Sequence, residues 1–252
     1  MDRLYDLGTF AGIQRRLAGC AVLCLILGAE PPRCLGADQW GGSIAATSDY
    51  LVRGISRTNN QAALQLDLHY VDSAGWVAGL FASNTQIDPY DPRDVELNGY
   101  LGFAWAASGD WRAKILAGYY LYPWNAEGSQ YNYGELDFDL LYQDWLDVGV
   151  SYSPDAPRFL PGRGLFGVSA GSAELNLQHA VFGKLSGTAG AGYYYMDGPG
   201  ATGYVYWSVG AAYDLAPVTV AAAYVDTTAG AKTLFYNAAA AGRWTATVIW
   251  RF

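Results

Sequence analysis

The C-terminal segment, residues 244–252, alternates between apolar and polar side chains. Every second residue counted back from the end is apolar: Phe252, Trp250, Val248, Ala246 and Trp244. The positions between them are mostly polar. Because a β-strand points successive side chains to opposite faces, this segment has one apolar face and one mostly polar face. The pattern predicts a half-buried strand, which occurs in soluble sheets and in membrane barrels alike.

The same alternation recurs along the chain, and no helical stretch separates the segments. It predicts twelve strands, at residues 43–55, 62–71, 76–83, 95–106, 111–122, 133–142, 146–153, 167–178, 185–195, 203–213, 218–226 and 242–252. The eighth strand has the weakest pattern because residues 167–171 are small and rich in glycine.

The connections between these strands alternate in length. The longer ones are residues 56–61, 84–94, 123–132, 154–166, 196–202 and 227–241, and the shorter ones include 72–75, 107–110, 143–145 and 215–217. Outer-membrane barrels have an even number of strands, short periplasmic turns and longer external loops. Both termini then lie on the periplasmic side, where the first and last strands can pair and remove the open edges of the sheet. We therefore predict an all-β fold, a single transmembrane antiparallel up-and-down β-barrel of about twelve strands.

The alternation within each strand separates a lipid face from a lumen face. Leu136, Leu140 and Tyr142 share one face of the sixth strand, whereas the other face carries three acids. Acids against lipid cost roughly a few kcal/mol each near the membrane midplane, so they must face inward. The same reasoning predicts a charged lumen lined by Asp49, Arg53, Asp67, Glu96, Arg112, Lys114, Glu135, Asp137 and Asp139.

The composition supports a barrel without requiring one. Hydrophobic residues make up 52% of the 252 residues and charged ones 15%, yet no segment after residue 37 is an unbroken apolar run of membrane-helix length. Aromatic residues reach 15% and gather at strand ends, which predicts two interfacial girdles. The periplasmic girdle comprises Trp76, Trp105, Trp111, Trp145, Tyr213, Trp250 and Phe252. The outer one draws on Tyr119, Tyr120, Tyr122, Tyr133, Tyr193, Tyr194, Tyr195, Tyr204, Tyr206 and Trp244, some of which must point inward.

The first 37 residues differ from the rest of the chain. Arg15 and Arg16 precede an apolar stretch at residues 17–29, and small residues follow at 36 and 37. This order is typical of a secretory signal peptide, so we expect residues 1–37 to be cleaved and residues 38–252 to form the barrel. All three cysteines lie in this leader. Without the leader's four basic and three acidic residues, 11 basic and 20 acidic residues remain, a net charge of −9 that argues against nucleic-acid binding.

Residues 47–56, TSDYLVRGIS, resemble the opening motif of the Gcw_chp family of proteobacterial proteins. Residues 77–84 and 132–136 are similar to further stretches of that family. The family comprises proteins of unknown function that carry signal peptides and are taken to be outer-membrane barrels. The resemblance therefore implies a location and an architecture, but no substrate. If the motif continues the first strand with Tyr50 and Val52 facing lipid, Asp49 and Arg53 face the lumen, either as a structural network or along a permeation path.

The closing strand, which ends on Phe252, also resembles the last strand of bacterial outer-membrane barrels. In those proteins the C-terminal end is read by the barrel assembly machinery. The resemblance implies that Trp250 and Phe252 act as an assembly signal. The expected partners are thus outer-membrane lipid, the assembly machinery and small solutes.

Candidate catalytic chemistry is sparse. Only His69 and His179 are available as imidazole bases, and no serine and asparagine pattern accompanies them as in outer-membrane phospholipase, another twelve-stranded barrel. The loop acids Asp88, Asp91 and Asp94 could hold a divalent cation, but their spacing fits no EF-hand. We therefore expect no enzyme activity, no cofactor and no metal site.

Two functions fit this sequence. The first is a porin-like channel for small solutes with an acid-rich lumen, which can be open or filled because twelve strands lie between filled eight-stranded and open sixteen-stranded barrels. The alternative is a non-conducting barrel that acts through its external loops as a surface scaffold, adhesin or assembly component. The sequence leaves the solute and the oligomeric state open.

Overall fold

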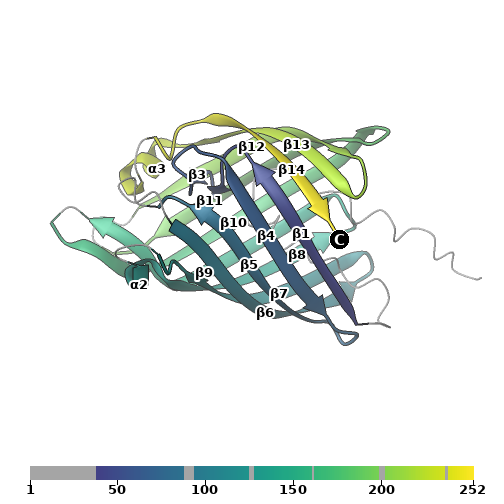
Figure 1. Cartoon of the computed structure of the whole chain (residues 1–252), viewed down its shortest axis with the longest axis horizontal. Coiled ribbons are helices and arrows are strands. Elements are labelled where there is room, and N and C mark those ends of the chain that lie inside the picture. Colours follow the sequence, from purple (N-terminus) through teal and green to yellow (C-terminus); the bar gives the residue numbers. More distant parts are fainter. Residues whose placement is uncertain (1–37, 88–93, 125–127, 161, 199–201, 236–237) are drawn as a thin grey trace, which may run out of the picture.

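A computed structural model describes residues 38–87, 94–124, 128–160, 162–198, 202–235 and 238–252, and these form a closed antiparallel barrel (Figure 1). Its twelve strands are β1 (Gln39–Thr47), β4 (Ala63–Val71), β5 (Trp76–Thr85), β6 (Asp94–Ser108), β7 (Trp111–Leu121), β8 (Tyr133–Tyr142), β9 (Leu146–Leu160), β10 (Gly164–Phe182), β11 (Leu185–Met196), β12 (Thr202–Asp214), β13 (Val218–Thr227) and β14 (Arg243–Arg251). The predicted fold and strand count are confirmed. The expected signal peptide lies outside the described residues.

The barrel closes where β1 pairs with β14, as predicted for the first and last strands. Ser43 lies opposite Arg251 in this register. The seam continues to the last residue, because the backbone amides of Gly42 and Phe252 each donate to the other's carbonyl, at 3.0 and 3.1 Å. Closure of this kind satisfies every strand edge, which a sheet in lipid requires.

Side-chain exposure follows the predicted alternation. On β4, Leu64 is 63% exposed and points outward, whereas Gln65 and Asp67 are each 4% exposed and point into the lumen. The outward leucines would be unfavourable in water and suit lipid, since burial of apolar surface is worth about 25 cal/mol per Å². No helix among the described residues is long and apolar enough to span a membrane.

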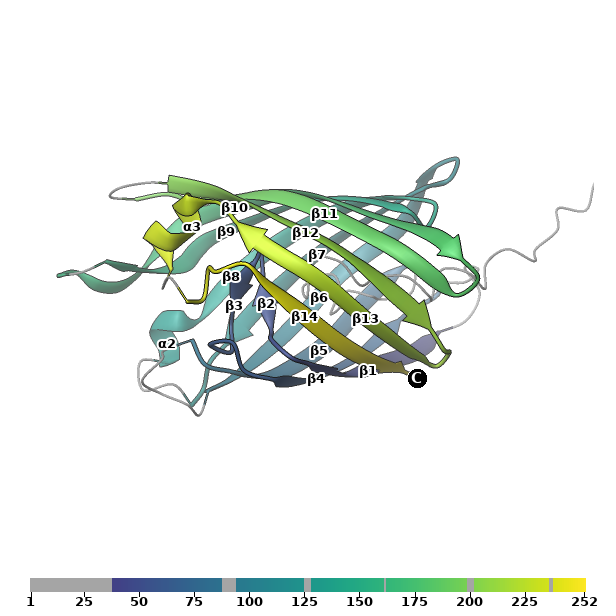
Figure 2. The ribbon, with the colours of Figure 1, turned by 90° about the horizontal axis from the view of Figure 1, so that it is seen from above.

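The two ends of the barrel differ (Figures 1 and 2). The terminus end carries residue 38, the C-terminus and tight turns. In one such turn, Asp72 Oδ1 accepts hydrogen bonds from the backbone amides of Ala74 and Trp76 at 2.9 and 2.8 Å. The loop end carries two short helices that the sequence pattern did not predict, α2 (Gly128–Tyr131) and α3 (Ala229–Leu234). Helices of four and six residues are too short to leave a periodic signal.

The aromatic girdles are only partly as predicted. Six of the seven residues predicted for the periplasmic girdle are exposed, and Trp111 is half-buried. The exposed ones are Trp76, Trp105, Trp145, Tyr213, Trp250 and Phe252. At the loop end, Tyr119, Tyr193, Tyr195 and Trp244 are exposed on the outer surface. The remaining aromatic residues of the predicted outer girdle point into the lumen instead and are buried there: Tyr120, Tyr122, Tyr133, Tyr194, Tyr204 and Tyr206.

Residues 154–166 were expected to form an external loop, and this prediction was wrong. β9 continues to Leu160 and β10 begins at Gly164, so the two strands extend as a hairpin beyond the point where β8 stops pairing at Tyr152 (Figure 2). Pro154 and Pro157 argue against a strand when the sequence is considered alone. Proline is tolerated here because this part of β9 is an edge with no partner on the β8 side.

The first predicted strand, residues 43–55, was also wrong in its second half. β1 ends at Thr47, and β4 pairs directly with β1 from Thr47 opposite Ala63 onward. The residues between them turn inward and form a separate two-stranded sheet of β2 (Leu51–Val52) and β3 (Ile55–Ser56). We call residues 51–56 the lumen hairpin; Figure 2 places it within the barrel at the loop end.

Candidate functional site: a hairpin inside a charged lumen

The lumen hairpin is a tight turn built by two residues with left-handed backbone angles. Leu51 pairs with Ser56 and Val52 with Ile55, so Arg53 and Gly54 form the turn. Their φ angles are 51° and 78°, which are the positive values of a type I′ hairpin turn. A Cβ on Gly54 would lie 2.6 Å from Cγ2 of Thr227, so glycine is also required by space.

The body of the lumen hairpin packs against several strands of the barrel wall. Leu51 packs with Ala223 and Val225 on β13. Tyr50 and Val52 pack with Phe81 on β5. These contacts correct the expectation that Tyr50 and Val52 face lipid, since their exposed fractions are 0% and 5%.

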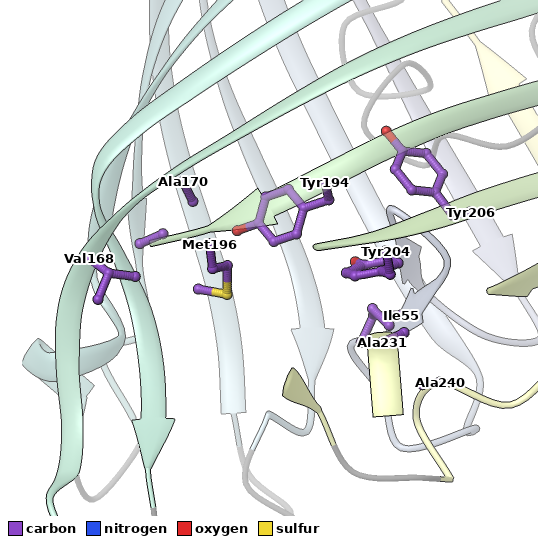
Figure 3. Packing of buried hydrophobic residues seen from close by; sticks show 10 residues of the cluster. Ile55, Val168, Ala170, Tyr194, Met196, Tyr204, Tyr206, Ala231 and Ala240 are labelled. Carbon is purple, nitrogen blue, oxygen red and sulfur yellow. The ribbon is translucent and has the colours of Figure 1, made fainter. Parts of the chain in front are cut away.

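Ile55 completes this packing on the third side. It belongs to a buried cluster with Tyr204 and Met196 of the wall and Ala231 of α3 (Figure 3). The connection that contains α3 therefore folds over the lumen hairpin, and the amide of Ser56 donates to the carbonyl of Ala239 at 3.0 Å.

Arg53 extends from the turn to the far wall. Its Nη2 donates to Glu135 Oε2 of β8 at 2.7 Å and to Ser151 Oγ of β9 at 2.8 Å. Its Nε donates to Ser172 Oγ of β10 at 3.2 Å, and its guanidinium lies 5.0 Å from the ring centre of Tyr194. These strands lie across the barrel from β1, so the lumen hairpin and its Arg53 side chain together span the lumen.

Asp49 secures the base of the lumen hairpin. One carboxylate oxygen accepts hydrogen bonds from Ser56 Oγ at 2.6 Å and Thr58 Oγ1 at 2.8 Å. The other accepts from Arg243 Nη1 at 2.7 Å, which links the hairpin to β14. Arg243 also donates to the carbonyls of Ala238 and Ala239, so one guanidinium joins both folded-in connections.

Glu96 provides the second anchor of this region. Its two oxygens accept hydrogen bonds from the hydroxyls of Tyr50 at 2.7 Å and Tyr122 at 2.6 Å. The side chain is almost fully buried, at 1% exposure. An ionised carboxylate is stable in such a place only when hydrogen bonds replace its hydration.

The remaining lumen charges lie closer to the terminus end. Asp67 binds His69 Nδ1 at 2.6 Å and accepts a hydrogen bond from the Tyr100 hydroxyl at 2.7 Å. Lys114 lies 3.2 Å from Asp139. Asp137 is buried between Glu135 and Asp139 on β8.

Most of the charged residues predicted for the lumen lie there. Those on its inner face are Asp49, Arg53, Asp67, Glu96, Lys114, Glu135, Asp137 and Asp139. Arg112 lies instead near the terminus-end rim, where its guanidinium contacts the carbonyl of Gln143. Trp250 and Phe252 lie on the outer surface beside each other, with ring centres 5.1 Å apart.

The sequence analysis missed several charged residues of the lumen, among them Glu174, Arg243 and Arg57. Parity could have found Glu174 on β10, which accepts a hydrogen bond from Tyr206 at 2.8 Å, and Arg243 on β14. Nothing in the alternation could have found Arg57, because it was expected in an external loop. Within the described residues there is no group of three or more histidine, cysteine and acidic side chains that could hold a metal ion. Asp88 and Asp91 lie outside the described residues.

Solved structures with a similar fold include porins. "KdgM porin" is 12% identical with a TM-score of 0.50, and the match covers 84% of this chain and 99% of that one. "NanC porin structure in rhombohedral crystal form" is 10% identical with a TM-score of 0.54, over 84% and 98% of the two chains. At such low identities the likeness shows the fold alone. No curated protein sequence matches the chain significantly.

The sequence itself matches a family described as "Bacterial protein of unknown function (Gcw_chp)" over residues 36–251. That range includes every strand of the barrel and the lumen hairpin. The family resemblance first indicated by residues 47–56 is thereby confirmed. The chain belongs to the Gcw_chp family, and its fold is that of a porin-like β-barrel.

Proposed function

We propose that the protein is an outer-membrane channel for small solutes whose lumen is closed at the loop end by the lumen hairpin. The observation that carries this proposal is that one short hairpin, tipped by Arg53, reaches across the barrel interior to polar side chains of the far wall. The short turns and both termini face the periplasm in this proposal, and residues 1–37 are removed during export.

A wet lumen is supported by polar atoms on five different strands. Gln65 Nε2, Asn98 Oδ1, Gln178 Nε2, Thr188 Oγ1 and Ser208 Oγ point inward and have no hydrogen-bond partner among the described residues. Buried polar groups without partners are costly, and water that enters an opened lumen would satisfy them. A channel needs a lumen that water can enter, whereas a non-conducting barrel can have a dry interior.

The lumen hairpin can move without opening the wall. β1 and β4 pair directly over nine residue pairs, so the barrel stays closed whatever the hairpin does. The hairpin itself has only two residue pairs, and isolated two-stranded hairpins are at best marginally stable. Its position therefore depends on side-chain contacts, above all those of Arg53 and Asp49.

The charges beneath the lumen hairpin favour cations. The three carboxylates on β8 have only two cationic partners. Arg53 forms an ion pair with Glu135, and Lys114 forms one with Asp139. Asp137 between them forms no ion pair among the described residues, and in a water-filled lumen it would carry the surplus negative charge. A ring or stripe of acidic side chains is a common source of cation preference in membrane pores.

The acidic side chains of β8 predict the selectivity of the conducting channel. Asp137→Asn, made in a barrel that lacks Val52, Arg53, Gly54 and Ile55, should shift the reversal potential in a KCl gradient toward zero. Planar-bilayer recording of refolded protein measures this shift. Asp110→Asn removes the same charge from an exposed turn at the terminus end and should leave the reversal potential unchanged. Equal shifts in both variants would contradict the acid-lined path.

A non-conducting scaffold is the second candidate function. It is favoured by the hairpin of β9 and β10 that projects beyond the loop end, since such a projection can contact a partner. The same recordings separate the two candidates. A bilayer that stays silent with the shortened lumen hairpin, while the protein shows the heat-modifiable gel migration of a folded barrel, would favour the scaffold.

A further inference from the structure

The side chains that contact the Arg53 guanidinium lie on the barrel wall. Glu135 belongs to β8, Ser151 to β9 and Ser172 to β10. Tyr194 of β11 places its ring centre 5.0 Å from Cζ of Arg53. Since none of the four comes from the lumen hairpin, they remain on the wall whether or not the hairpin is in place. We call these four residues the guanidinium site.

The strand register builds the guanidinium site from neighbouring positions. Ser151 lies directly opposite Ser172, and Ser172 lies directly opposite Tyr194, so the three form one row across β9, β10 and β11. The two serine hydroxyls are hydrogen-bonded to each other at 2.7 Å. On β8, Asp137 lies opposite Ser151, and Glu135 lies two residues nearer the loop end on the same face. The paired strands therefore fix the backbone of every member of the site.

Arg53 leaves part of the guanidinium site unused. It donates to Oε2 of Glu135 at 2.7 Å, whereas Oε1 is buried and has no hydrogen-bond partner among the described residues. A guanidinium carries five N–H donors in a planar fork that can bind both oxygens of one carboxylate. A guanidinium that is not attached to the hairpin could make both of these contacts.

We infer that the guanidinium site binds a small solute with a guanidinium group, and that Arg53 occupies the site in the closed barrel as an internal ligand. The carboxylate neutralises the charge, the hydroxyls accept N–H groups, and the tyrosine ring contacts the planar cation. The solute needs no space beside Arg53, because it takes the place of Arg53 when the lumen hairpin leaves. The inference rests on the proposed function in naming a solute class for the channel, but binding by itself does not require conduction.

The first test supplies the arginine side chain as a free molecule. Arg53→Gly removes the side chain and leaves the turn unstrained, since the φ angle of residue 53 is 51°. Propylguanidinium, which is an arginine side chain without its backbone, should bind this refolded variant in detergent micelles. Isothermal titration calorimetry measures the affinity. Wild-type protein should bind at least about tenfold more weakly, because the attached Arg53 competes at an effective concentration in the millimolar range.

Two analogues separate the charge of the ligand from its shape. Propylurea keeps planar N–H donors without the charge, and butylammonium keeps the charge without the planar fork. Each should bind Arg53→Gly at least about tenfold more weakly than propylguanidinium, because the charged, two-pronged contact with the carboxylate is lost.

Variants of two acids test the anchor. Glu135→Gln in the Arg53→Gly background should weaken propylguanidinium binding by about tenfold or more, since it removes a charged hydrogen-bonding partner. The matched control is Asp110→Asn in the same background, which removes an acid from an exposed turn and should leave the affinity unchanged. Heat-modifiable migration confirms that each variant is folded before titration.

The barrel that lacks Val52, Arg53, Gly54 and Ile55 distinguishes a site on the wall from a hole left by one side chain. It retains all four residues of the guanidinium site, so it should still bind propylguanidinium at least about tenfold more tightly than propylurea. If the folded shortened barrel did not distinguish the two compounds, the wall alone would not form the site.

Three further results would overturn the inference. Folded Arg53→Gly protein that fails to bind propylguanidinium excludes the site, whatever the conductance shows. Butylammonium or propylurea that binds as tightly as propylguanidinium excludes recognition of a guanidinium group. An affinity that is unchanged by Glu135→Gln excludes this carboxylate as the anchor. A silent bilayer with propylguanidinium binding intact would instead contradict the channel and leave the site standing.

Discussion

Removing Val52, Arg53, Gly54 and Ile55 and joining Leu51 to Ser56 through two glycines is expected to convert a mostly closed barrel into a conducting one. Leu51 and Ser56 are paired strand residues, about 5 Å apart, so the shortened connection fits without moving β1 or β4. The deletion removes the ion pair with Glu135 and the arm that spans the lumen. Planar-bilayer recording of refolded wild-type and shortened protein measures the change.

The size of this effect follows from the buried ion pair at the tip. Separating Arg53 from Glu135, which are 6% and 2% exposed, costs about 3 kcal/mol if neither finds a new partner. Such a cost keeps the open state rare, so its removal should raise the time-averaged conductance on the order of 100-fold. An increase below about twofold, with folded protein, would mean that the lumen hairpin does not limit conduction.

A point substitution separates the arm from the hairpin body. Arg53→Asn leaves an Asn-Gly turn, the sequence that type I′ hairpins favour, so the hairpin can persist while its tip loses the far wall. We expect a conductance between those of wild type and the deletion. Because this variant leaves Glu135 unpaired, Arg53→Asn combined with Glu135→Gln serves as the charge-balanced control. A conductance that changes with the net charge of these variants, and not with the length of the side chain at position 53, would contradict a steric closure.

Deleting Phe252 is expected to lower the amount of barrel assembled in the outer membrane of a Gram-negative host by roughly tenfold, while refolding in detergent stays near normal. The structural loss is small, because Phe252 contributes two backbone hydrogen bonds with Gly42 at the seam and each is worth about 1 kcal/mol. A large assembly defect beside a small stability defect therefore indicates a recognition signal. The measurement compares heat-modifiable protein in membrane fractions with urea unfolding of the refolded barrel.

Phe252→Tyr tests which property of the last residue matters. It keeps the aromatic ring and the seam hydrogen bonds, so assembly should remain close to wild type. Normal assembly of the truncated chain would show that the terminal aromatic residue is not a signal. The barrel fold does not depend on this result. A parallel fall in refolding and in assembly would assign the defect to the seam instead.

The strands were predictable because lipid and lumen impose opposite polarity on alternate residues. The acids of β8 illustrate this, since Glu135, Asp137 and Asp139 could face only a polar interior and do so. Alternation carries no such signal in a segment that has the same environment on both faces. Leu51, Val52 and Ile55 are apolar as lipid-facing residues are, but they pack inside the lumen against walls that are distant in sequence.

The sequence by itself therefore determined the barrel, its closure and most of the charged residues of the wall, because these follow from a local period of two and from chain order. Only the tertiary structure decided that residues 51–56 fold inward and that Arg53 reaches β8, β9 and β10. These features depend on contacts across the lumen between strands far apart in the chain. No local pattern encodes such contacts, because their energy appears only once the wall has closed around the hairpin.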